Sequence, residues 1–136
     1  MNYKSEIGKL GEDLACEYLE NKGFKIIERN YRRKWGELDI VAKDPKNVLV
    51  FIEVKALRFG NSAIAELFNA ANQDDLLPEE NLTAAKLKKL KRTASLYAGN
   101  HQELINDKKG WRIDLMAIRL FSEENYQINH IENIEY

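Results

Sequence analysis

Three residues in one short segment combine two carboxylates with a lysine. Asp39 lies in a run of β-forming residues at 37–42, and Glu53 and Lys55 end a second such run at 48–55. Glu53 and Lys55 are two residues apart, so in a strand both side chains point to the same face. Because burying an unpaired charge is costly, charges at the end of an otherwise apolar strand need a compensating interaction.

The turn between the two runs decides whether the carboxylates meet. A two-residue loop would place Asp39 opposite Ile52, and Glu53 would then face the other way. A three-residue loop at 45–47 would place Asp39 directly opposite Glu53, with about 4.5–5.5 Å between the Cβ atoms. Asn47 tolerates the left-handed backbone that the longer loop requires, although the sequence permits both loops.

Two converging carboxylates beside a lysine suit the metal-assisted hydrolysis of a phosphodiester bond. Mg²⁺ prefers hard oxygen ligands and keeps several waters. Such an ion lowers the pKa of a bound water and screens the charge that grows on phosphorus. Lys55 would orient the attacking water or stabilise that charge. The alternative is a solvated ion pair of Glu53 and Lys55 at a strand edge, which the spacing alone favours because E-x-K triplets are common.

Length and composition indicate one globular domain. The chain has 136 residues, of which 44% are hydrophobic and 32% charged, enough for one core under a polar surface. With 21 basic and 22 acidic residues the net charge is -1, which excludes a histone-like protein. Cys16 is the only cysteine, which excludes an intramolecular disulfide and a cysteine-rich zinc site. No apolar run could span a bilayer and residues 1–6 lack a secretory apolar core, so we expect no membrane association and a cytoplasmic location.

The remaining pattern predicts the elements that position the motif. Helices are expected at 5–22 and 84–98, and strands at 24–29, 37–42, 48–55 and 111–120, with a weaker strand at 126–134. The segment 57–81 is acidic in its second half and contains Pro78, so we expect a mobile excursion from a single domain that spans residues 1–136. This order predicts an α/β or α+β sandwich, with helices on the faces of a sheet.

Two basic clusters lie near the motif. The first contains Arg29, Arg32, Arg33 and Lys34, and the second, on the later helix, contains Lys86 and Lys89. Tyr31 and Trp35 flank the first cluster and could stack on exposed bases. Basic segments around a candidate metal site suit binding of a nucleic-acid backbone, although most lysine runs on helices are simply solvated.

Two further carboxylates have less certain roles from sequence alone. Glu12 lies at the rim of the apolar face of the first helix, where it is either part of the site or an ordinary exposed glutamate. Asp114 lies in a predicted strand and could support the site or pair with Arg112 or Arg119. We expect the structural role for Asp114.

The carboxylate motif stands inside a longer pattern. It reads WGELDIVA at 35–42 and VFIEVK at 50–55, preceded by GKLGEDLA at 8–15 and RNYR at 29–32, and followed by LT at 82–83 and WRIDL at 111–115. In this order and spacing, over roughly residues 5–120, the chain resembles the bacterial YraN family. That family is placed in the PD-(D/E)XK nuclease superfamily and is similar to archaeal Holliday-junction resolvases.

The resemblance implies a restriction-endonuclease-like fold, an α-β-β-β-α-β sandwich whose central mixed sheet is flanked by helices. It implies a divalent-metal-dependent nuclease acting on DNA, with branched or damaged DNA as candidate substrates. Asp39, Glu53 and the backbone carbonyl of Val54 would hold Mg²⁺ or Mn²⁺, and Lys55 would be the catalytic lysine. Glu12 would be an additional acidic residue of the site. Lys86 would be an auxiliary basic residue.

The chain departs from the family pattern in two places. After E-V-K, family members often carry Thr or Ser and then Arg, where this chain has Ala56 and Leu57. The segment 61–81 is also longer and more acidic than in most members. A homodimer would supply two sites for cutting both strands. The alternatives to a nuclease are a non-catalytic nucleic-acid-binding module with the same fold and a protein-interaction domain.

Overall fold

The computed structural model describes residues 3–58, 82–106, 108–122 and 124–134. The elements in these ranges are α1 (Tyr3–Asn21), β1 (Lys25–Arg33), β2 (Gly36–Lys43), β3 (Leu49–Arg58), α3 (Ala84–Asn100), the short 3-10 helix η3 (Gln102–Leu104), β4 (Trp111–Leu120) and β5 (Tyr126–Ile131). The excursion expected at 57–81 lies outside the described residues, apart from its first two residues, which extend β3.

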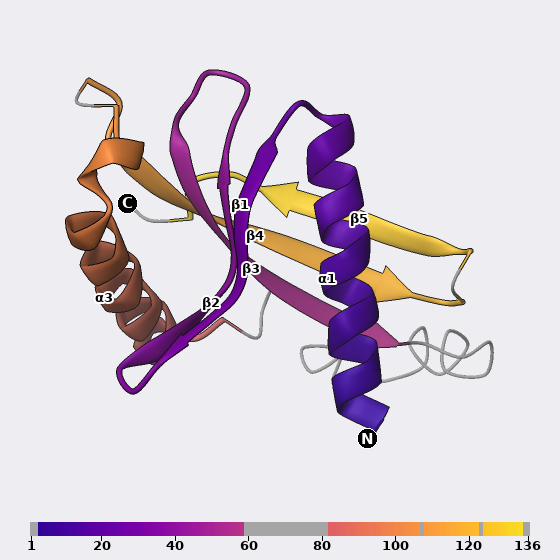
Figure 1. Cartoon of the computed structure of the whole chain (residues 1–136). Helices are drawn as coiled ribbons and strands as arrows, with labels where there is room; N and C mark the ends of the chain where they lie inside the picture. The colour runs from indigo at the N-terminus through magenta and orange to yellow at the C-terminus, as the bar shows by residue number, and fades with distance from the viewer. Residues whose placement is uncertain (1–2, 59–81, 107, 123, 135–136) are drawn as a thin grey trace.

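The five strands form one mixed sheet in the order β1-β2-β3-β4-β5. The pair β3–β4 is parallel, and the other three pairs are antiparallel. Helices α1 and α3 lie on opposite faces of this sheet (Figure 1). The expected α/β sandwich with a mixed sheet between helices is therefore confirmed, and β5 adds a strand at its edge. None of the described helices combines the length and apolar character needed to cross a membrane.

Strand β3 is buried on both faces, as its continuous apolar run predicts. Val50 and Ile52 belong to the core under α1, whereas Leu49 and Phe51 belong to the core under α3. This alternation follows from the two-residue period of a strand. The central strand thus connects two cores, and whatever follows the apolar run is fixed in position by both.

The hairpin between β2 and β3 has the longer of the two possible loops. The N–H of Asp44 donates to the carbonyl of Val48 at 2.9 Å, and Asn47 adopts the left-handed φ of 67°. The ladder pairs Ile40 with Ile52 and proceeds in step to the turn. One further step in this register sets Asp39 opposite Glu53. The three-residue loop is therefore confirmed, and the two-residue alternative is wrong.

The β1–β2 hairpin changes face half-way along its length. Ile40 packs in the core under α1, but Leu38, two residues earlier, packs in the core under α3. Asn30 adopts a left-handed φ of 54° at the same level of β1. A regular strand keeps residues two apart on one face, so the hairpin bends here and reaches across to α3 (Figure 1).

The bend places Tyr31 inside the protein. Its side chain is 4% exposed, and its ring packs edge-on against Tyr97 of α3 at 5.0 Å between centroids. The expectation that Tyr31 could stack on bases is therefore wrong. The strand predicted from sequence ended at residue 29, and Tyr31 was grouped with its exposed basic neighbours.

Asp114 is fully buried and forms the centre of a polar network. It accepts hydrogen bonds from Arg112 at 2.9 Å and from the backbone N–H of Asn133 at 2.9 Å, and it contacts Nε2 of His130 at 2.9 Å. Arg112 also donates to Asp44 in the β2–β3 turn at 2.6 Å. The expected pairing with Arg112 is confirmed, and the network ties the turn to β4 and β5.

Replacing Asp114 by Asn should cost about 3–5 kcal/mol of unfolding free energy at pH 7, because Arg112 keeps its buried charge without its main partner. Burial raises the pKa of Asp114, but the hydrogen bonds from His130, Arg112 and Asn133 outweigh it and hold that pKa below its ordinary value. The wild type should therefore lose this stabilisation as the pH falls below about 4, and the variant should lack that part of the acid sensitivity.

Urea denaturation at pH 7 and pH 3 measures both effects. The control is Asp13→Asn, which removes an exposed partner of Arg29 and should change the unfolding free energy by at most about 1 kcal/mol. Equal losses in the two variants would contradict the structural role assigned to the Asp114 network.

Candidate functional site

The site forms where β2 and β3 separate. The described ladder between them ends at the pair Ile40–Ile52. If it continued, the N–H of Val54 would bond to the backbone of β2. Instead it donates to the side chain of Asp39, with 2.8 Å between nitrogen and Oδ2. The carboxylate of Asp39 therefore fills the opening between the two strands and is held by the backbone of the strand that carries Glu53.

The second carboxylate faces the first. Burial, followed by a hydrogen bond to Asp39 and the charge of that residue, raises the pKa of Glu53 far above its ordinary value, against the opposing charge of Lys55. Two carboxyl groups this close repel each other when both are charged, so Glu53 keeps its proton to a higher pH than an ordinary glutamate. The structure thus places the Asp39 carboxyl beside that of Glu53, with the charge of Lys55 acting on Glu53, whereas the spacing alone favoured a solvated ion pair of Glu53 and Lys55.

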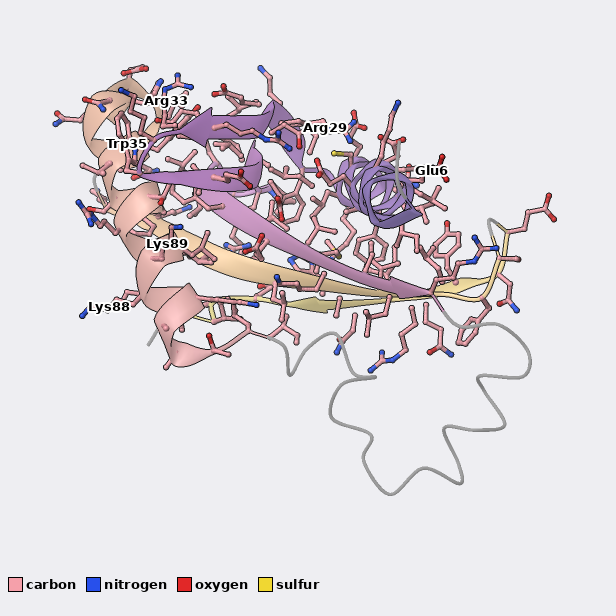
Figure 2. The ribbon with its side chains drawn as sticks, turned by 90° about the horizontal axis from the view of Figure 1, so that it is seen from below. Glu6, Arg29, Arg33, Trp35, Lys88 and Lys89 are labelled. Carbon is pink, nitrogen blue, oxygen red and sulfur yellow. The ribbon has the colours of Figure 1, made fainter. Side chains whose placement is uncertain are left out.

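A basic pocket opens beside Glu53, between the β1–β2 hairpin and α3. It has a volume of about 430 Å³, and its lining residues are Arg33, Lys34, Gly36, Glu37, Glu53, Lys86, Lys89, Leu90 and Thr93. Four of these are cations, and they come from two segments far apart in the sequence. Figure 2 shows Arg33 at the end of the hairpin and Lys89 on the neighbouring helix. In the sequence these cations belong to two separate clusters, and the bent hairpin brings them to one pocket.

The hairpin tip docks on α3 through a contact that the sequence analysis missed. A Cβ on Gly36 would lie 2.0 Å from the hydroxyl oxygen of Thr93, so only glycine permits this approach. The single hydroxyl hydrogen of Thr93 lies within reach of two carbonyls, that of Lys89 at 3.0 Å and, at the longer distance of 3.4 Å, that of Trp35. Gly36 itself was the available signal for a close contact, but the sequence did not indicate that Thr93 on the helix is its partner.

Arg29 and Arg32 lie apart from the basic pocket. They line a second pocket, of about 530 Å³, between α1 and β1 with Glu12 and Asp13. Arg29 donates to Asp13 at 2.7 Å and lies 3.9 Å from Glu12. The bend at residue 30 therefore divides the first basic cluster between two pockets, and acidic neighbours offset the charge of Arg29.

Glu12 is positioned by a close approach of α1 to the sheet. A Cβ on Gly11 would lie 2.7 Å from the Cβ of Ala56, so this helix packs directly over β3. The Glu12 side chain is 16% exposed, and its Oε1 is buried without a hydrogen-bond partner. Burial and the nearby charge of Asp39 raise its pKa. Glu12 is thus a half-buried carboxylate on the site side of α1 and not an ordinary surface glutamate.

These donors fit a hard divalent cation in part. Mg²⁺ is commonly held by one or two carboxylates, with waters and substrate phosphates completing its shell. The neighbouring carboxyls of Asp39 and Glu53, and the Glu12 oxygen that accepts no hydrogen bond, are donors of that type. Within the described ranges, no three acidic, histidine or cysteine side chains already converge as a ligand cluster. The contact that involves Val54 is made by its N–H, so a role for its carbonyl stays a prediction.

Comparison with known proteins identifies the family. Residues 11–118 match the model of the "Uncharacterised protein family UPF0102". The chain belongs to the UPF0102 family. This is the YraN family, so the resemblance recognised from the motifs is confirmed. The matched region begins at Gly11 and includes every site residue named above from Glu12 to Lys89.

Curated UPF0102 relatives align along most of the chain. A UPF0102 protein of Clostridium botulinum (strain Loch Maree) is 38% identical over 135 residues, which cover 98% of this chain and 97% of the relative. One from Dictyoglomus turgidum is 38% identical over 120 residues, covering 88% and 86%. One from Desulforamulus reducens is 37% identical over 131 residues, covering 96% and 95%.

Replacing Glu53 by Gln should stabilise the protein at alkaline pH in the presence of EDTA. Because the Glu53 pKa is raised on folding, the wild type should lose stability as the pH rises above the ordinary glutamate value of about 4.3. Glutamine has no charge to bury and can still bond to Asp39. We expect the stability of the variant relative to wild type to rise by about 1–3 kcal/mol between pH 4 and pH 8.

The measurement is urea denaturation at both pH values. Glu37→Gln is the matched control, since the Glu37 side chain lines the same pocket but is 67% exposed. Its stability relative to wild type should differ by less than about 0.5 kcal/mol between the two pH values. An equal pH response of the two variants would show that Glu53 carries no burial cost.

Proposed function

We propose that this protein is a divalent-metal-dependent nuclease that hydrolyses phosphodiester bonds in DNA. The observation that carries the proposal is that Glu53, which the register of β2 and β3 sets opposite Asp39, lines the basic pocket. A pair of carboxylates attracts a cation, whereas the surrounding lysines and arginines attract a polyanion. Only a substrate that brings its own negative charge to a bound metal uses both features.

Each side chain of the pair has a defined task in this proposal. Asp39, fixed by the N–H of Val54, presents a carboxylate oxygen to the cation from a rigid position. Glu53 would supply the second carboxylate ligand. Bound Mg²⁺ or Mn²⁺ would supply Lewis acidity and a nucleophilic water. Glu12 would contribute a further acceptor from α1.

Lys55 acts on the reacting phosphate. It lies on the same strand face as Glu53, and its charge already acts on that carboxyl. An ammonium group there stabilises the extra negative charge that develops on the phosphoryl oxygens during attack. The basic pocket includes Lys86 and Lys89. Its cations bind the flanking phosphates and hold the DNA strand next to the two carboxylates.

Replacing Glu53 by Ala should lower metal-dependent cleavage by about 100-fold or more, because the lost ligand removes several kcal/mol of transition-state stabilisation. The measurement uses duplex, single-stranded, flap and four-way-junction DNA, each with Mg²⁺, Mn²⁺ or EDTA. Glu37→Ala, prepared identically, is the control because it removes an exposed carboxylate from the same pocket. This control should cut within about threefold of the wild type.

The outcomes separate the candidate functions. Equal cutting by wild type and Glu53→Ala would indicate a contaminating nuclease and remove the site assignment. Salt-sensitive DNA binding without cutting by any of the folded proteins would indicate a binding module with the same fold. Neither binding nor cutting would leave a protein-interaction domain as the remaining candidate.

A further inference from the structure

Trp35 is the exposed aromatic residue at the tip of the bent hairpin. Its side chain is 39% exposed, and besides Leu96 it is the only large hydrophobic residue within the described ranges that is so exposed. Isolated apolar residues are common on protein surfaces, so exposure alone says little. The position of Trp35 is more informative. Along the chain it lies between Lys34 and Gly36, two residues that line the basic pocket beside Glu53.

The backbone beneath this side chain is held firmly. The carbonyl of Trp35 accepts a hydrogen bond from Thr93 at 3.4 Å, and Gly36 packs directly on the same threonine. Thr93 itself is 1% exposed. A tip anchored in this way can present a large rigid ring without the entropy loss of ordering a free loop.

The neighbouring charges favour a polyanionic partner. Arg33 lies over the ring of Tyr31, with 4.3 Å from its guanidinium carbon to the ring centroid, and Tyr31 packs on the buried Tyr97. Figure 2 shows Arg33, Trp35 and Lys89 at the same end of the molecule, where the hairpin meets α3. An exposed aromatic ring near basic side chains is an arrangement that proteins use to stack on bases while they contact phosphates.

We propose that Trp35 stacks on an unpaired base, so that the basic pocket selects nucleic acid with single-stranded character next to the carboxylate pair. The inference rests on the proposed function of this same pocket and narrows its substrate class. Bases within a duplex are already stacked on their neighbours, so an indole reaches a base face only at a single strand, a gap, a flap or a branch. A continuous duplex would meet the same cations but would leave the ring unused.

The test measures equilibrium binding in EDTA, where no cutting occurs. The probes are a single-stranded oligonucleotide, the same strand with abasic positions, and a blunt duplex. Trp35→Ala should weaken binding to the single strand about tenfold and change duplex binding by less than about twofold. Trp35→Phe should restore most of the affinity, and wild type should bind the abasic strand as weakly as Trp35→Ala binds the intact one.

Leu96→Ala is the matched control, because Leu96 is 40% exposed and, unlike Trp35, has no neighbour in the chain that lines the basic pocket. It should bind all probes as the wild type does. A difference in tryptophan fluorescence quenching between wild type and Trp35→Phe gives a direct signal of stacking, since Trp111 is present in both.

Equal affinity of wild type and Trp35→Ala for the single strand would overturn the inference, as would equal losses on all three probes or no binding by the wild type. The cleavage experiment with Glu53→Ala uses metal and reads product, so the two proposals can fail separately. If cleavage depends on Glu53 but Trp35→Ala binds the single strand as the wild type does, only the stacking role is removed. Trp35-dependent binding without cleavage would remove only the nuclease.

Discussion

The hydrogen bond from the N–H of Val54 to the carboxylate of Asp39 is the contact on which the site depends. It occurs where two antiparallel strands part, and it replaces a backbone bond with a side-chain bond. Because the donor belongs to β3, the acceptor is fixed relative to Glu53, one residue earlier. The sheet itself, rather than a loop, thus sets the distance between the carboxylates. Buried strands are among the most rigid elements a protein offers for a reactive pair.

Two glycines allow close packing on the two faces of the sheet, and each of these contacts positions a further part of the candidate site. Gly11 lets α1 approach β3 at Ala56, which brings Glu12 close enough for the charge of Asp39 to raise its pKa. The small side chain of Ala56 suits this contact. On the opposite face, Gly36 lets the hairpin tip rest on Thr93. Both approaches use the space that a missing side chain leaves.

Much of the fold was predictable because its signals are local. The order of helices and strands follows from such signals, whereas the residues around Asn47 permitted two loops and left the pairing of Asp39 with Glu53 open until the register was known. The division of the basic residues was not predictable. It depends on the left-handed backbone of Asn30. One polar residue within a strand pattern does not show that the strand bends there. The burial of Tyr31 has the same origin. To predict that Glu12 is half-buried, one must know how closely α1 packs on the sheet. The pattern of residue types in the sequence does not give that distance.

The sheet order also has a consequence for how the protein folds. The carboxylate pair comes from a hairpin whose strands are joined by a three-residue turn, and such hairpins form within microseconds. The parallel pair β3–β4, which aligns Leu49 with Trp111, must instead wait for a long stretch of chain to close. Arg112 at the start of β4 then bonds to Asp44 in the early turn. We therefore expect the β3–β4 ladder, which completes the central sheet, to form after the hairpin that carries the carboxylate pair.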